Sequence, residues 1–306
     1  TFTEDYIFVS GATEDDLEGR TNTICHEMAH MWFGDLVTMK WWDDLWLKES
    51  FADFMGTLGA KEANNFNDAW VTFANNRKAW AYMQDQLPTT HPIVADIPHL
   101  EAASQNFDGI TYAKGASVLK QLVAWVGEDA FYAGARRYFQ DHAFGATRLG
   151  DLLAALEAAS GRSLEQWKGA WLETTGPSVL SASWSTGPFG EVTDFTLHQS
   201  GGASGGVLRP HRLVVSTWKF GGGRLEATHS FDVRIEGESA PIDPEGALAH
   251  PGGQAALLPS ACPHLAQQPF HPACAPLPTG EKPWLPLKSS TNICARFVSS
   301  AAPCSG

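Results

Sequence analysis

The sequence lacks the features of a membrane protein, a secreted protein or a nucleic-acid-binding protein. No stretch approaches the roughly 20 consecutive apolar residues that a membrane-spanning helix needs, and the first residues do not show the charged-then-apolar pattern of a secretion signal. Basic residues are also scarce. The 21 Lys and Arg stand against 34 Asp and Glu, which gives a net charge of -13, and they form no cluster suited to phosphate contacts. We therefore expect a cytoplasmic protein that binds neither membranes nor nucleic acid.

Cysteine is scarce as well, with five residues in the chain of 306. Four of them, Cys262, Cys274, Cys294 and Cys304, lie near the C-terminus. No two of these are two to four residues apart, so their spacing disfavours a structural zinc knuckle. The same segment, 259–306, is rich in proline and has no hydrophobic periodicity, which predicts an irregular or disordered tail.

The rest of the chain is long enough for two hydrophobic cores. Apolar residues recur at helical spacing in the segments 67–84, 112–126, 129–142, 149–160 and 164–174, the last with a possible capping box at Ser163 and Gln166. After Gly176 and Pro177 they alternate instead, which predicts strands at 179–184, 194–198, 212–220 and 225–235. We expect an α+β fold, with a mostly helical domain at 1–177 and a small antiparallel β-sandwich at 178–258.

The N-terminal segment leads into another predicted helix. Residues 2–9 alternate enough to predict a strand, and the acidic segment 11–19 predicts a loop. The helix is expected to start at one of the N-cap candidates Thr21, Asn22 and Thr23 and to stop at Gly34. Its apolar side chains recur at helical spacing, which predicts a buried face made of Ile24, Met28, Met31 and Trp32.

Residues 26–30 of this helix read H-E-x-x-H. His26 and His30 lie one turn apart on one helix face, so both imidazoles can bind the same metal ion. Glu27 is next to the first histidine, close enough to take a proton from a water molecule without binding the metal itself. Two histidines leave a zinc site incomplete. We expect the third ligand to be Glu49, which lies on an amphipathic helical run among large apolar residues.

Asp53 lies one helical turn after Glu49. A carboxylate at this position can orient a ligating histidine through its second ring nitrogen. A solvated surface acid is the alternative. The tryptophans Trp32, Trp41, Trp42, Trp46, Trp70 and Trp80 are expected to be mainly core residues, with one or two of them lining a substrate pocket.

Eighteen residues separate His30 from Glu49, and this spacing resembles the M1 zinc aminopeptidases of the aminopeptidase N group. Segments 26–39 and 46–49 are similar to that family almost throughout, although Lys48 stands where many members carry Asn. Segment 108–115 resembles the family's Y-x-K-G segment, whose tyrosine, here Tyr112, is a transition-state residue. The resemblance extends over roughly residues 1–258.

The resemblance implies a thermolysin-like catalytic domain that holds one Zn²⁺ per chain and hydrolyses peptides with a free N-terminus. In this interpretation Glu27 is the general base, and Tyr112 donates a hydrogen bond to the developing oxyanion. We expect a monomer. By the same resemblance, an N-terminal β-domain and a G-A-M-E-N motif, whose glutamate binds the α-amine of the substrate, belong upstream of Thr1.

Two alternatives stay open at this point. One is a truncated fragment that binds zinc but has little or no turnover, because the glutamate that binds the α-amine is not among these residues. The other, which the spacing favours less, is a zinc endopeptidase.

Overall fold

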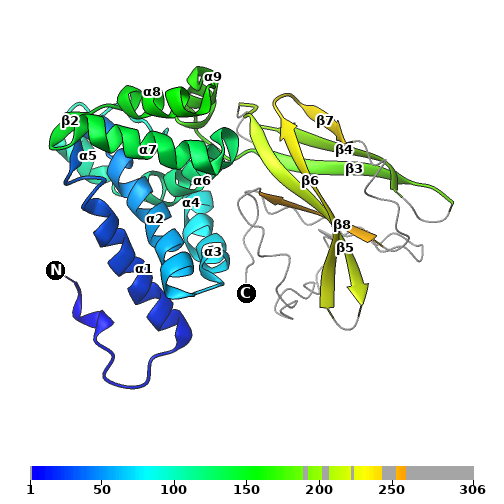
Figure 1. The fold of residues 1–306 in the computed structure, drawn as a ribbon, viewed down its shortest axis with the longest axis horizontal. Helices are drawn as coiled ribbons and strands as arrows, with labels where there is room; N and C mark the ends of the chain where they lie inside the picture. Colours follow the sequence, from blue (N-terminus) through cyan, green and yellow to red (C-terminus); the bar gives the residue numbers. More distant parts are fainter. Residues whose placement is uncertain (1, 189–191, 202–206, 222–223, 243–252, 260–306) are drawn as a thin grey trace. The chain divides into compact units, whose positions relative to one another are not determined.

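The computed structural model describes residues 2–188, 192–201, 207–221, 224–242 and 253–259 (Figure 1). The chain divides after Pro177 into two compact units. The first unit is mostly helical and the second consists of antiparallel sheets, so the fold is α+β as predicted. Within the described ranges, no helix is both long and apolar enough to cross a membrane. The predicted irregular tail, apart from Pro259, lies outside the described residues.

The first unit contains α-helices, 3-10 turns, two π-helices and a two-stranded parallel sheet. In chain order these are η1 (Glu4–Tyr6), α1 (Glu14–His30), β1 (Val37–Met39), η2 (Trp42–Asp44), α2 (Trp46–Asn64), α3 (Ala69–Thr72), the π-helix η3 (Phe73–Arg77), α4 (Lys78–Asp85), α5 (Leu100–Gln105), the π-helix η4 (Ile110–Lys114), α6 (Gly115–Val126), α7 (Glu128–His142), β2 (Gly145–Thr147), α8 (Leu149–Ser160) and α9 (Glu165–Trp171). The helical segments predicted between residues 67 and 174 are confirmed.

The N-terminal predictions were wrong. Residues 4–6 form a 3-10 turn where we expected a strand, and α1 starts at Glu14, inside the expected loop. The cause is a capping box. The Asp16 amide donates to the Thr13 hydroxyl oxygen at 3.2 Å, and the Thr13 amide donates to the Asp16 carboxylate at 2.8 Å. Acidic residues in the first turn also stabilise the positive end of the helix dipole. The segment 21–23 therefore lies inside the helix rather than at its cap.

The expected buried face of α1 is also wrong. Ile24, Met28, Met31 and Trp32 are exposed, Met31 to 58%. The helix packs on α2 through a different face, where Gly56 of α2 lies close to α1; a Cβ there would be 3.2 Å from the Cβ of His26. Small residues at the crossing bring the two backbones close together, so the histidine side of α1, and not its apolar stripe, faces the interior.

A second predicted cap is likewise absent. The N-cap residue of α9 is Leu164, whose side chain makes no capping bond, and not Ser163. The Leu164 backbone amide donates instead to the Glu157 carboxylate at 2.6 Å. A carboxylate from the preceding helix therefore takes the place of the local capping box.

Helix α2 forms the centre of the first unit. Trp46 and Phe51 are almost fully buried, and the Phe51 ring stacks on Phe33 with centroids 4.2 Å apart. Phe131 of α7 stacks on the same Phe51 ring, with centroids 6.3 Å apart. Closely packed aromatic side chains of this kind restrict movement of the helix that carries them. Helix α2 therefore gives the polar residues of its first turns a rigid support.

The second unit contains two three-stranded antiparallel sheets, with strand orders β3-β4-β7 and β6-β5-β8. The strands are β3 (Val179–Thr186), β4 (Val192–Ser200), β5 (His211–Gly221), β6 (Arg224–Ile235), β7 (Ser239–Ile242) and β8 (Gly253–Pro259). The four predicted strands correspond to β3 to β6. One buried apolar cluster contains residues of both sheets, namely Leu180, Phe195, Leu197, Leu213, Val215, Val233 and Ile235.

Candidate functional site

The two histidines of the H-E-x-x-H motif lie on one face at the end of α1. Their Nε2 atoms are 3.2 Å apart. The Nδ1 atom of His30 lies 3.0 Å from the carbonyl oxygen of Phe33. A carbonyl only accepts, so this Nδ1 carries the proton and donates it. The Nε2 lone pair of His30 is therefore directed toward His26 and available to a metal ion.

Glu49 completes this group from the first turn of α2. Its Oε2 atom lies 3.3 Å from Nε2 of His30 and 3.6 Å from Nε2 of His26. The three ligand atoms all lie within 4.8 Å of one another. Glu49, which was expected from the sequence to join the two histidines, lies beside both of them because α1 and α2 cross closely.

The electrostatics of the group suit a cation. Burial raises the pKa of Glu49, but its close contacts with the two histidines and the charge of Lys48, whose Nζ is 3.1 Å away, hold that pKa well below its usual range. Glu49 is therefore an ionised carboxylate in a buried position. Two imidazole nitrogens and one carboxylate oxygen are the donor set of many catalytic zinc sites, so these residues fit a zinc ion.

Glu27 does not join this group. It lies on α1 beside His26, but its side chain is exposed. Among the described residues it makes no hydrogen bond or ion pair with His30 or Glu49. Its prediction as general base therefore rests on its place in the motif.

Tyr112 lies directly beside the three candidate ligands. Its ring stacks on the His26 ring, with centroids 6.0 Å apart and planes inclined by 16°. Burial and then the negative charge of Glu49 raise the pKa of the Tyr112 hydroxyl far above its usual value. The hydroxyl therefore keeps its proton and remains a hydrogen-bond donor next to the candidate metal position.

The π-helix η4, which carries Tyr112, is fixed at its start. Oδ1 of Asp108 accepts hydrogen bonds from the amides of Ile110 and Thr111, both at 3.0 Å. Oδ2 of the same carboxylate lies 2.9 Å from Nε2 of His91. Burial lowers the pKa of His91, but the Asp108 carboxylate more than offsets this, so that the pKa is raised.

The end of η4 is fixed by a buried ion pair. Nζ of Lys114 donates to Oδ1 of Asp85 at 2.8 Å, and both side chains are buried. The same oxygen accepts hydrogen bonds from the Gly176 amide and the Thr90 hydroxyl, each at 2.9 Å. Tyr112 is therefore carried by a short segment that is held at both ends.

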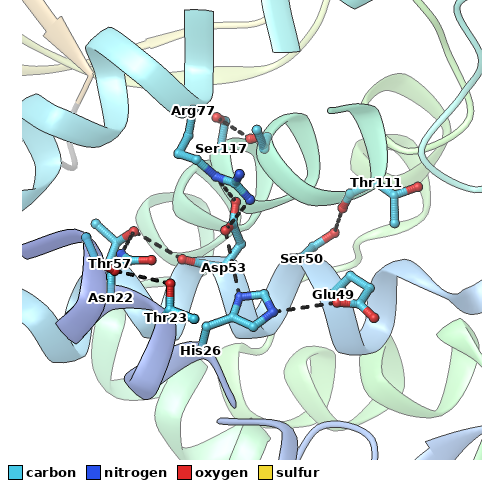
Figure 2. Close-up of polar contacts among 12 residues, drawn as sticks. Asn22, Thr23, His26, Glu49, Ser50, Asp53, Thr57, Arg77, Thr111 and Ser117 are labelled. Carbon is cyan, nitrogen blue, oxygen red and sulfur yellow. Dashed lines mark hydrogen bonds and ion pairs between the residues drawn. The ribbon is translucent and has the colours of Figure 1, made fainter. Parts of the chain in front are cut away.

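Asp53 is buried, one turn after Glu49 on α2, and the surface-acid alternative is wrong. Its Oδ1 lies 3.8 Å from Nδ1 of His26, the ring nitrogen that faces away from the other ligands (Figure 2). Arg77 of η3 binds the same carboxylate through two nitrogens. No motif in the sequence identifies Arg77, because it lies in a polar stretch of a helical segment.

A pocket of about 460 Å³ opens beside His30. Trp41, Trp42 and Lys48 are among the residues that line it, together with the end of β1. Two of the six tryptophans therefore line a pocket next to the candidate ligands. The expectation that the six are mainly core residues is wrong, because only Trp46 and Trp70 are buried, whereas Trp32 and Trp41 are exposed.

The chain matches one family model and several known proteins. The family model described as "Peptidase family M1 domain" matches residues 1–171. Aminopeptidase N of Streptomyces lividans is 51% identical over 247 residues, which cover 78% of this chain and 29% of that protein. Tricorn protease-interacting factor F2 of Thermoplasma volcanium is 41% identical over 179 residues, covering 56% of this chain and 22% of that protein. Probable aminopeptidase 2 of Sulfurisphaera tokodaii is 41% identical over 162 residues, covering 53% and 21%. The chain thus spans less than a third of the length of each of these relatives.

Proposed function

The chain belongs to peptidase family M1, and from this membership we propose that the protein is a zinc-dependent aminopeptidase that removes N-terminal residues from peptides. The observation that carries the proposal is the convergence of Nε2 of His26, Nε2 of His30 and Oε2 of Glu49 on one point. Three ligands leave a fourth position for water or substrate, which is the arrangement of catalytic zinc sites. We propose one zinc ion per chain.

Zinc in such a site supplies Lewis acidity, which polarises a carbonyl group and makes a water molecule nucleophilic near neutral pH. Glu27, adjacent to His26 on α1, takes the proton of the attacking water and passes it to the leaving amine. Tyr112 donates its hydroxyl hydrogen to the oxyanion that develops on the scissile carbonyl. The raised pKa of the Tyr112 hydroxyl and its position beside His26 support this role.

The finer features of the fold are part of the same proposal. We propose a thermolysin-like arrangement for the helical catalytic domain at 1–177 and a β-sandwich for the domain at 178–258. The division of the chain after Pro177 and the apolar cluster shared by the two sheets support this description.

The test measures the rate of hydrolysis of alanyl and leucyl chromogenic amides and of their N-acetylated forms. It uses the protein without substitutions, here called the parent, and the variant Glu27→Gln. We expect the parent to cleave only the substrates with a free amine. Glu27→Gln is nearly isosteric, so it should keep its zinc and lose turnover by about 10²- to 10⁴-fold. Cleavage of the acetylated amides at the same rate would exclude an aminopeptidase, and full activity in Glu27→Gln would exclude Glu27 as the base.

A further inference from the structure

Arg77 binds Asp53 with both arms of its guanidinium group. Nη2 donates to Oδ1 at 2.7 Å and Nε donates to Oδ2 at 3.2 Å (Figure 2). Such a bidentate contact fixes the plane of the carboxylate as well as its position, which the single point charge of a lysine does not do. Asp53 is buried while Arg77 is partly exposed, so the arginine closes the carboxylate off from the solvent side.

Asp53 in turn faces the first candidate ligand. Its Oδ1, the atom that accepts the shorter bond from Arg77, is 3.8 Å from Nδ1 of His26. Figure 2 shows His26 between Asp53 and Glu49, with one ring nitrogen toward each. The orientation of this carboxylate therefore bears on the orientation of the His26 ring, whose other nitrogen faces the metal position.

Arg77 also lies over the ring of Tyr112. The guanidinium carbon is 5.9 Å from the Tyr112 ring centroid and 5.1 Å from that of Trp80. Because Tyr112 stacks on His26, the contacts form a closed circuit: Arg77 to Asp53, Asp53 to His26, His26 to Tyr112, and Tyr112 back to Arg77. Each member comes from a different element, namely η3, α2, α1 and η4.

Two members of this circuit come from π-helices. Arg77 is the last residue of η3, and Tyr112 lies in the middle of η4. A π-helical turn holds an extra residue compared with an α-helical turn, so it changes the direction in which the following side chains point, and such turns occur often at functional sites. The two π-helices therefore carry neighbouring side chains: Tyr112 lies against His26, and Arg77 lies over Tyr112 and binds Asp53.

We propose that Arg77 is a positioning residue of the zinc site: it holds Asp53 toward His26 and supports the ring of Tyr112, so that one side chain aligns a ligand and the oxyanion donor together. This inference rests on the proposed function. An ordinary surface ion pair has neither a buried partner nor a ligand behind that partner, and it contributes little. Removal of groups that orient metal ligands usually lowers metal affinity or activity by 10- to 100-fold.

The experiment measures zinc affinity by competition with a chelating dye, and kcat and KM separately on an alanyl chromogenic amide. We expect Arg77→Ala to weaken zinc binding and to lower kcat, each by about 10- to 100-fold, with little change in KM. Arg77→Lys should retain part of the zinc affinity and part of kcat, because lysine keeps the positive charge but not the two parallel N–H donors of the guanidinium group. Free guanidinium ion should restore part of the kcat of Arg77→Ala, because the arginine site is open to solvent; loss of the overall fold would not be restored in this way.

Arg137→Ala is the matched control, because Arg137 forms an exposed pair with Asp141 on α7, away from the site. It should leave zinc affinity and kcat unchanged. Equal zinc affinity and kcat in Arg77→Ala and in the parent would overturn the inference. So would a loss of activity in Arg77→Ala that neither guanidinium nor lysine restores. If the parent itself bound no zinc and cleaved no substrate, the proposed function would fail first, which is a separate result.

Discussion

Ser50 donates a hydrogen bond from its hydroxyl to the backbone carbonyl of Thr111, with the two oxygens 2.5 Å apart. Ser50 follows the candidate ligand Glu49 on α2, and Thr111 precedes Tyr112 on η4 (Figure 2). The bond is buried, so it is shielded from competing water. It couples the element that supplies the third ligand to the element that supplies the oxyanion donor.

The close contact at Ser50 requires a glycine at position 115. A Cβ on Gly115 would lie 1.9 Å from the Ser50 hydroxyl oxygen and 2.7 Å from its Cβ. We therefore predict that Gly115→Ala lowers the free energy of unfolding by about 1 to 3 kcal/mol through overpacking. Gly150→Ala is the control, because that helical glycine has nothing within 4 Å of its Cβ position. It should be neutral or stabilising by up to about 1 kcal/mol in urea unfolding. Equal effects of the two changes would contradict this account.

Stability should depend on pH through the pair of His91 and Asp108. The pKa of His91 is raised in the folded protein, so its protonated form stabilises the fold fully below the unfolded-state pKa of about 6.5, and this contribution is lost as pH rises through the raised value. We predict that the melting temperature of the parent falls more steeply than that of His91→Gln between about pH 6 and pH 9. Parallel curves for the two proteins would show that the pair contributes nothing.

The buried ion pair at the end of η4 should be important for stability. Lys114→Met leaves the Asp85 carboxylate in the interior with only its two neutral donors, and such a loss typically costs about 3 to 5 kcal/mol. Lys168→Met is the control, because Lys168 pairs with exposed glutamates and should change stability by less than about 1 kcal/mol. Urea unfolding of both variants checks this prediction, and an equal loss in the two would refute it.

Tyr112→Phe should separate turnover from metal binding. Loss of one oxyanion donor lowers kcat by about 10²- to 10³-fold, while zinc content should stay unchanged because the three candidate ligands are untouched. Tyr132→Phe, which removes a hydroxyl elsewhere in the same unit, should keep full activity. If Tyr112→Phe turned over substrate at the parent rate, Tyr112 would not be the donor.

The candidate ligands were predictable from the sequence because their spacing along the chain follows helical geometry. His26 and His30 are four residues apart on one helix, and Glu49 lies in the first turn of a largely buried helix that packs beside it. Tyr112 was predictable only through the family resemblance, since no local pattern distinguishes it from a core tyrosine.

Other features depend on contacts that no local pattern reveals. Arg77 binds Asp53 across 24 residues, and a π-helical turn directs it there. The start of α1 was misjudged because several threonines competed as caps, and only the reciprocal bonds between Thr13 and Asp16 decide between them. The apolar stripe of α1 shows that helical periodicity identifies a face but not what covers it.

The most direct test is the metal content of the purified protein after zinc reconstitution and removal of free metal, measured by elemental mass spectrometry beside His30→Ala and His142→Ala. We predict about one zinc ion per chain in the parent and in His142→Ala, whose histidine lies at the end of α7, and little zinc in His30→Ala. Less than about a tenth of an equivalent in the parent, or full occupancy in His30→Ala, would contradict a zinc centre held by His26, His30 and Glu49.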